Sequence, residues 1–187
     1  MRLQLHPGRE CRVALAFDGR ARRDADGSLR IVIRLEGDVM QLQLPARAEA
    51  ARKDGLWQHT CFEAFVAGGD AASYCEFNFS PSGEWAAYGF SGYRAGMRPL
   101  AADAVAGARW ERGAGFLQLD LDLRPGAYID RAAVLPWRVG LAAVIEERTG
   151  VLSYWALHHP VAAPDFHHPQ GFTVELPPVA AGRATRR

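Results

Sequence analysis

Two turn signals in the stretch from 54 to 93 constrain the fold more than any other feature of this sequence. Gly68-Gly69 can supply the positive φ angles of a tight reversal. Ser80-Pro81-Ser82-Gly83 suits a type I turn closed by a glycine. The turns separate three short strand patterns and predict two successive antiparallel hairpins. Because side chains along a strand alternate between the faces of a sheet, the turns also predict which residues share a face.

One face of these hairpins is predicted to be apolar and to belong to the core: Phe62, Ala64, Val66, Cys75, Phe77, Phe79, Trp85 and Ala87. The other face collects the polar residues and two aromatic neighbours: Glu63, Glu76, Asn78 and Tyr88, with Phe65 and Tyr74. The predicted register pairs Glu63 with Glu76, and Glu76 with Tyr88. This polar face is either the solvated outer surface of an antiparallel sheet or the floor of a ligand cleft. A slip of one residue would exchange the faces.

Alternation of apolar and polar residues predicts further short strands at 2–5, 11–17, 29–35, 39–44, 115–123, 137–145, 151–157 and 172–176. Residues 29–35 and 39–44 are expected to pair as a hairpin, and so are 137–145 and 151–157. Segments 20–27 and 94–108 are expected to be loops, and 124–135 to contain a helical turn. About ten short strands with little helix predict an all-β fold, an antiparallel β-sandwich.

The composition is that of one globular domain, expected at 1–176, followed by a disordered tail at 177–187. The 22 basic and 21 acidic residues give a net charge of +1, which argues against nucleic-acid binding. No apolar run is long enough to cross a membrane, and the first residues lack the apolar run of a signal peptide. Three cysteines without motif spacing indicate a reducing compartment. We therefore expect a cytoplasmic protein without nucleic-acid or membrane partners; its oligomeric state stays open.

A histidine-rich segment at 157–169 is the first candidate for chemistry. It contains His158, His159, His167 and His168 together with Asp165. Such a set could ligate a metal, but adjacent histidines are poorly spaced for tetrahedral closure. The alternatives are that the histidines order the loop through hydrogen bonds, or that one or two of them contact a ligand.

The two glutamates of the polar face are the second candidate. Paired carboxylates can perform acid and base catalysis, and opposed carboxylates raise the pKa of one partner. His59 lies two residues before Cys61, but no third group that would complete a catalytic dyad is identifiable. Flat rings such as Trp57 and Trp155 beside carboxylates and amides would instead suit a carbohydrate. For each tryptophan, packing in the core is the alternative.

Several of these segments resemble a known group of proteins. Leu56-Trp57, Thr60-Cys61-Phe62-Glu63-Ala64-Phe65 and the run 74–84 resemble small bacterial DOMON-like proteins and, more distantly, family 9 carbohydrate-binding modules. Segments 153–157 and 164–172 resemble the same small proteins. The resemblance implies an immunoglobulin-like or DOMON-like β-sandwich that binds sugar or haem. Haem-binding relatives use a methionine and a histidine, which here would be Met97 with His158 or His167.

The sequence thus leads to one expected function and two alternatives. We expect a non-catalytic module without a cofactor that binds a small molecule, a sugar or a sugar-containing metabolite. The expected ligand-binding residues are Trp57, His59, Glu63, Glu76, Asn78, Tyr88, Trp155, His158 and His167. The first alternative is a haem-binding electron-transfer domain. The second is an enzyme that depends on a metal or on the carboxylate pair.

Overall fold

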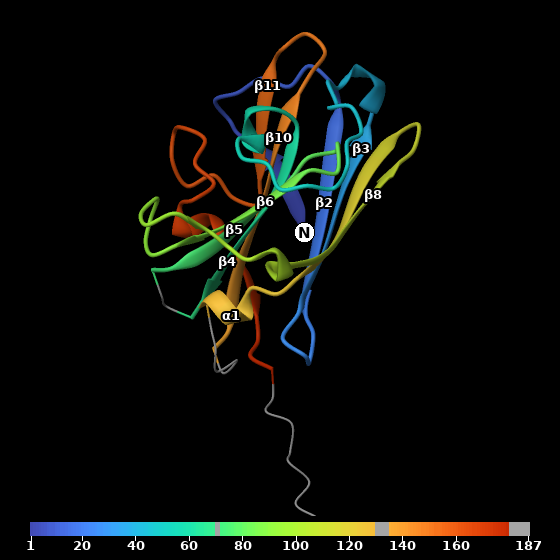
Figure 1. Ribbon diagram of the computed structural model, residues 1–187. Coiled ribbons are helices and arrows are strands. Elements are labelled where there is room, and N and C mark those ends of the chain that lie inside the picture. The colour runs from blue at the N-terminus through green and yellow to red at the C-terminus, as the bar shows by residue number, and fades with distance from the viewer. Residues whose placement is uncertain (70–71, 130–134, 180–187) are drawn as a thin grey trace, which may run out of the picture.

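The computed structural model describes residues 1–69, 72–129 and 135–179, and these form a sandwich of antiparallel strands (Figure 1). The first six strands are β1 (Arg2–Leu5), β2 (Leu15–Arg23), β3 (Leu29–Gly37), β4 (Cys61–Gly68), β5 (Tyr74–Phe79) and β6 (Trp85–Phe90). The others are β7 (Arg98–Pro99), β8 (Val105–Arg112), β9 (Phe116–Leu123), β10 (Trp137–Glu146), β11 (Leu152–Ala156) and β12 (Val174–Leu176). The predicted β-sandwich is confirmed. Strand β7 lies within the expected loop 94–108, and β8 begins in it and continues to Arg112.

The helical segments are short. The α-helix α1 (Gly126–Ile129) confirms the helical turn expected within 124–135. The described residues also contain four 3-10 turns: η1 (Val39–Gln41), η2 (Leu56–Gln58), η3 (Ala102–Ala104) and η4 (Pro169–Gly171). In the described part of the chain, no helix has the length and apolar character needed to cross a membrane.

The strands follow one path, β7-β6-β5-β4-β10-β11-β1-β2-β3-β9-β8, and β12 pairs with β10 beside β11. Strand β1 takes part in both layers of the sandwich. Arg2 and Leu3 pair with β2, whereas Gln4 and Leu5 pair with β11. Figure 1 shows β2, β3 and β8 in one layer and β4, β5, β10 and β11 in the other. Strand β1 therefore connects the two layers along one edge.

Aromatic rings fill the space between the layers. Phe17 on β2 contacts Phe62 on β4 and Trp155 on β11, with ring centroids 5.7 and 5.0 Å apart. Phe62 also lies 4.9 Å from the ring of Trp110 on β8. All residues of the predicted core face are buried except Trp85, which is partly buried and packs against the core. Alternation along β4, β5 and β6 thus predicted the core correctly.

Strand β2 is displaced from its predicted position. Residues 11–17 were expected to be a strand and 20–27 a loop, but β2 runs from Leu15 to Arg23. The hydrophobic pattern did not reveal this strand because it has a small residue, Gly19, at an inward position. Gly19 faces the opposite layer so closely that a Cβ atom there would lie 2.6 Å from Cδ1 of Leu141. A glycine fits this approach without any shift of Leu141, and it breaks the apolar alternation.

The hairpin expected between 29–35 and 39–44 is wrong. Strand β3 pairs with β2 and β9, and Val39–Gln41 forms the 3-10 turn η1. The side chain of Asp38 accepts a hydrogen bond from the backbone N–H of Met40 at 3.2 Å, which stabilises a turn at this point. The hairpin of β10 and β11 is confirmed. Of the expected tail 177–187, residues from 180 onward lie outside the described residues.

The register of the first central hairpin differs from the prediction by two residues. Glu63 pairs with Asn78, and Phe65 pairs with Glu76, because the turn occupies more residues than Gly68-Gly69 and one neighbour. A shift of two residues keeps every side chain on its predicted face. In the second hairpin Glu76 pairs with Tyr88 and Asn78 with Ala86, as predicted. Cys61 and Cys75 lie on opposite faces, and all three cysteines are free.

Candidate ligand-binding site

The outer face of β4, β5 and β6 carries a cavity of about 510 Å³. Five of the residues that the sequence predicted for ligand binding line it: Trp57, Glu63, Glu76, Tyr88 and His167. Loops that follow β6 and β11 complete the walls. Figure 1 shows these loops, in yellow-green and orange-red, beside β4 and β5. The volume is in the range of small-molecule sites in proteins.

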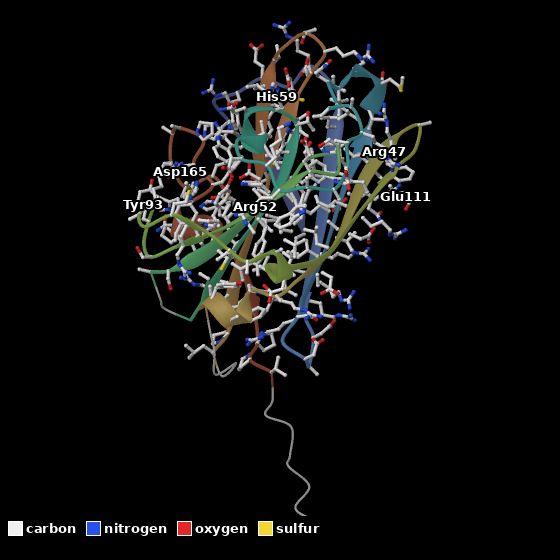
Figure 2. All side chains as sticks on the ribbon, viewed as in Figure 1. Arg47, Arg52, His59, Tyr93, Glu111 and Asp165 are labelled. Atoms are coloured by element: carbon white, nitrogen blue, oxygen red, sulfur yellow. The ribbon has the colours of Figure 1, made fainter. Side chains whose placement is uncertain are left out.

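The other four predicted residues do not line this cavity. Asn78 is buried beside Glu76 on β5, where its amide donates a 2.6 Å hydrogen bond to Oε1 of Glu76. Trp155 faces the core, and its indole N–H donates to Oγ of Ser153 at 3.0 Å. His59 is exposed, with Nδ1 2.7 Å from Oε2 of Glu146, and Figure 2 shows it away from Tyr93 and Asp165. His158 borders a separate small hollow.

The floor of the cavity holds two buried carboxyl groups. Glu63 is 3% exposed and Glu76 is 5% exposed, so this face is not a solvated surface. Burial raises the pKa of Glu63 well above the usual value, and the nearby Glu76 raises it further. Burial also raises the pKa of Glu76, although the hydrogen bond from Asn78 opposes the shift. Oε1 of Glu63 is buried without a hydrogen-bond partner in the described structure.

His167 presents an N–H group to these carboxyls. The backbone N–H of Arg94 donates to the hydroxyl of Tyr74 at 3.2 Å, and that hydroxyl lies 2.7 Å from Nδ1 of His167. If the hydroxyl accepts from Arg94, its own proton points to Nδ1. The neutral imidazole then carries its proton on Nε2, which lies 3.7 Å from Oε2 of Glu76. This distance is too long for a direct hydrogen bond and leaves the Nε2 proton for a ligand.

His167 is neutral at pH 7 in this setting. Burial lowers its pKa to about 4, and the charge of Arg94 contributes in the same direction. Its closeness to Glu76 is therefore not an ion pair at neutral pH.

Tyr93, Arg94 and Asp165 connect the two loops that form the walls. Nη2 of Arg94 donates to Oδ1 of Asp165 at 2.8 Å, and the hydroxyl of Tyr93 donates to Oδ2 at 2.5 Å. Burial opposes ionisation of Asp165, but the hydrogen bonds from Tyr93 and Arg94 outweigh it and lower the pKa. Arg94 has a φ of 51°, which is uncommon for a residue other than glycine. Figure 2 shows Tyr93 and Asp165 next to each other.

Aromatic residues form the rim. Trp57, in η2, is 41% exposed and meets the ring of Tyr88 edge to face, with centroids 6.3 Å apart. The hydroxyl of Tyr88 donates to Oδ1 of Asp54 at 2.6 Å. Burial and this carboxylate raise the pKa of Tyr88. Tyr88 is thereby fixed, while Trp57 presents a free surface at the mouth.

His159 and His168, in the loop after β11, make hydrogen bonds. Nε2 of His159 lies 2.9 Å from the carbonyl oxygen of Gln4, and His168 accepts from the backbone N–H of Gln170 at 3.3 Å. Within the described residues, no group of three histidine, cysteine, aspartate or glutamate side chains is arranged to hold a metal ion. The bonds instead fix the loop against β1 and η4.

The cavity does not fit a haem group well. Met97 and His167 both line it, whereas His158 lies elsewhere. A porphyrin over the floor would cover Glu63 and Glu76 with apolar surface and leave Oε1 of Glu63 buried without a partner. Such burial of unpaired polar groups is costly.

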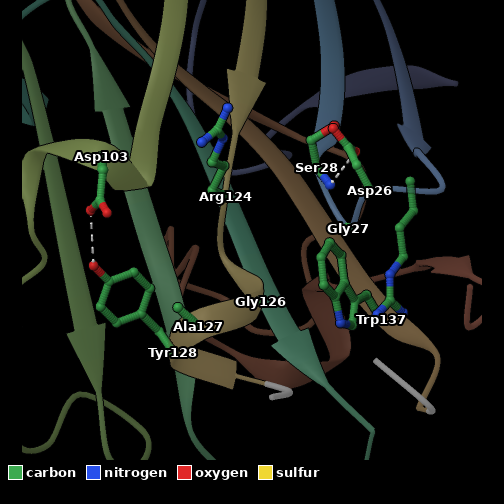
Figure 3. A pocket seen from close by; sticks show the side chains of 10 residues that line it. Asp26, Gly27, Ser28, Asp103, Arg124, Gly126, Ala127, Tyr128 and Trp137 are labelled. Atoms are coloured by element: carbon green, nitrogen blue, oxygen red, sulfur yellow. Dashed lines mark hydrogen bonds between the residues drawn. The ribbon is translucent and has the colours of Figure 1, made fainter. Parts of the chain in front are cut away.

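A second hollow of about 670 Å³ lies at the α1 end of the sandwich (Figure 3). No residue that the sequence predicted for ligand binding lines it. Two of its acidic side chains already have partners: Asp26 accepts from Ser28 at 2.7 Å, and Asp103 accepts from Tyr128 at 3.5 Å. We therefore assign the candidate site to the smaller cavity.

Six further residues line the cavity and were missed from the sequence: Phe90, Arg94, Val144, Tyr154, Pro164 and Phe166. Met97 also lines the cavity, and the sequence named it only as a possible haem ligand. Two of the six missed residues had a signal. Phe90 continues the alternation of Tyr88 along β6, and Tyr154 occupies the face opposite the inward Trp155 on β11. The residues from the loops had none, because no periodicity places a loop over a sheet.

His167→Gln should change how stability depends on pH. The folded pKa of about 4 lies below the ordinary 6.5, so this histidine stabilises the fold above pH 6.5 and loses that contribution as the pH falls towards 4. The difference amounts to at most about 2–3 kcal/mol, since the ring is partly screened by solvent. In urea unfolding, the free-energy difference between wild type and variant should shrink from pH 7 to pH 4. A constant difference would contradict this.

Comparison with known proteins relates this fold to carbohydrate-binding structures. No family model matches the chain, and no curated protein matches it. A Bacteroides uniformis protein that is thought to bind carbohydrate is 17% identical over 88% of this chain and 78% of its own, with a TM-score of 0.55. A family 9 carbohydrate-binding module of Caldicellulosiruptor kristjanssonii with cellotriose is 7% identical, covering 99% and 86%, with a TM-score of 0.55.

A third structure, of a family 9 module from the same bacterium with glucose, is 7% identical over 94% of this chain and 83% of its own, with a TM-score of 0.51. At such identities the likeness concerns the fold. The chain has the β-sandwich fold found in family 9 carbohydrate-binding modules.

Proposed function

We propose that this protein is a non-catalytic module that binds a sugar or a sugar-containing metabolite in the cavity over β4, β5 and β6. The observation that carries the proposal is a buried polar floor under an aromatic rim. Glu63 and Glu76 lie at the floor, and the exposed Trp57 lies at the mouth. A sugar has hydroxyl groups for such a floor and an apolar face for such a ring.

The polar groups of the site match the hydroxyl groups of a sugar. A hydroxyl both donates and accepts, so it can serve the free Oε1 of Glu63 and the Nε2 proton of His167 in one ligand. The two similar structures solved with cellotriose and with glucose add support from the fold. Membership of the DOMON-like group is proposed from the sequence motif alone.

Trp57→Ala should weaken binding of cellotriose, used as a probe, by about tenfold or more, equivalent to about 1.4 kcal/mol. The reason is the loss of the ring on which the sugar stacks. Isothermal titration at pH 7 measures the two dissociation constants. Met40→Ala is the control, because Met40 is 57% exposed but lies on η1, outside the cavity.

Two results would oppose the proposal. Cellotriose, glucose and a panel of other mono- and disaccharides could all fail to bind the wild type. Alternatively, binding could be equally strong in Trp57→Ala, which would place the ligand elsewhere. Chromatography of the cellotriose after incubation should show intact trisaccharide. Release of glucose would instead indicate a hydrolase that uses Glu63 and Glu76.

A further inference from the structure

The charge arrangement in the cavity points to a narrower class of ligand, an inference that rests on the proposed function. Glu63 and Glu76 lie on adjacent strands and line the same space. Each is almost fully buried, and neither forms a hydrogen bond with a lysine or an arginine in the described structure. Two acids in one desolvated space repel each other once ionised.

The neighbouring groups do not supply the missing positive charge. Arg94 lines the cavity, but its guanidinium is paired with Asp165 at 2.8 Å. Asn78 offers one neutral hydrogen bond, to Glu76. The titratable groups that interact with the two acids from β4, β5, β6 and the two loops are Cys61, Tyr74, Tyr88, Arg94 and His167. None of them is a cation free to pair with both acids.

The walls above the acids are aromatic. Trp57, Tyr88, Phe90, Tyr154 and Phe166 surround the same space. Faces of aromatic rings attract cations, and the attraction grows when water is excluded. Rings together with acids therefore provide the two elements that recognise an organic cation.

We propose that the preferred ligand is an amino sugar with a free ammonium group, which sits between Glu63 and Glu76 while the ring packs on Trp57. An ammonium group has three donors and a positive charge. It can serve the unpartnered Oε1 of Glu63 and an oxygen of Glu76 together. Charge-assisted hydrogen bonds of this kind are roughly twice as strong as neutral ones. A neutral sugar hydroxyl brings no positive charge that could stabilise the ionised form of the two acids.

Three matched trisaccharides test this preference. Cellotriose, fully deacetylated chitotriose and triacetylchitotriose differ at C2 of each ring, which carries a hydroxyl, an ammonium and an acetamide group. Titration at pH 6.5 should show that deacetylated chitotriose binds wild type at least tenfold more tightly than cellotriose does. In Glu63→Gln the ratio of the two affinities should fall towards one. Met40→Ala should retain the wild-type ratio.

Proton release gives a second readout that needs no variant. An ammonium group entering the site favours the ionised acids, so protons should leave Glu63 or Glu76 on binding. Titration in two buffers with different ionisation enthalpies should report net release of protons for deacetylated chitotriose. Cellotriose should release fewer.

The outcomes separate this inference from the proposed function. If cellotriose or triacetylchitotriose binds as tightly as the deacetylated trimer, the inference is overturned while sugar binding stands. Binding of the deacetylated trimer without proton release, and with an unchanged ratio in Glu63→Gln, would also overturn the inference. If none of the three binds, both fail. Tight binding of the deacetylated trimer alone, with proton release, supports both.

Discussion

Glu63→Gln should make the protein more stable than wild type at neutral pH, and the gain should grow as the pH rises. Burial and Glu76 raise the folded pKa of Glu63 above its ordinary value of 4.5. A carboxyl with a raised pKa contributes stability that is fully present below the unfolded pKa and is lost as the pH rises towards the folded pKa. Each pH unit in that window costs about 1.4 kcal/mol per proton. The Glu63→Gln variant does not lose this stability as the pH rises, because glutamine cannot ionise.

Urea unfolding of both proteins between pH 4 and pH 8 measures this effect. The free energies of unfolding should be similar at pH 4 and separate steadily above pH 4.5. Glu175→Gln is a suitable control, because Glu175 lies on β12 with its side chain exposed. Its difference from wild type should stay within about 0.5 kcal/mol across the range. A Glu63→Gln variant that tracks wild type at every pH would show that Glu63 ionises without cost.

Phe62→Ala should lower the free energy of unfolding by about 3–5 kcal/mol, the usual cost of removing a buried aromatic ring. Phe62 is fully buried and contacts Phe17 and Trp110 in the opposite layer, so the lost ring leaves a gap between the layers. Chemical denaturation measures the loss. The folded variant should bind cellotriose within about twofold of wild type, since Phe62 points away from the cavity.

Phe65→Ala is the matched comparison on the same strand. Phe65 is equally buried but lies on the site face, where its ring stacks on Phe172 and meets the ring of His167 at 5.3 Å. We expect a loss of stability of similar size, about 3–5 kcal/mol, together with weaker cellotriose binding. The reason is that His167 loses the ring that positions it. If Phe62→Ala and Phe65→Ala bound cellotriose equally well, the site face of β4 would matter no more for binding than its core face.

The faces of β4, β5 and β6 could be predicted from the sequence because alternation depends only on the parity of each position. Glu63 and Glu76 were therefore placed together despite a register error of two residues. The length of the turn after Gly68 determines the register, and glycines signal a turn without fixing its length. Strand β2 was displaced in the prediction because Gly19, which packs closely against Leu141, resembles a turn residue.

The walls of the site could not be predicted in the same way. Arg94 and His167 approach the floor from loops whose paths depend on tertiary contacts such as Arg94 with Asp165 and Tyr74 with His167. Trp155 was assigned to the site in place of Tyr154 because a tryptophan in a strand gives no sign of its direction. Trp155 shares a face of β11 with Ser153, which is buried. Its partner Phe17 lies on a strand whose position was itself predicted wrongly.

The floor and the walls of the cavity are held by different kinds of contact. The floor belongs to β4 and β5, which are joined to each other and to β10 by the backbone hydrogen bonds of the sheet. The walls are connected near the surface by the bonds of Asp165 with Tyr93 and Arg94. Surface ion pairs are weak, and loops open far more easily than central strands. Amide hydrogens of the floor should thus exchange with solvent only when the whole protein unfolds, while those of the walls exchange through local opening. A ligand can therefore enter and leave by local opening of the walls while the strands of the floor stay folded.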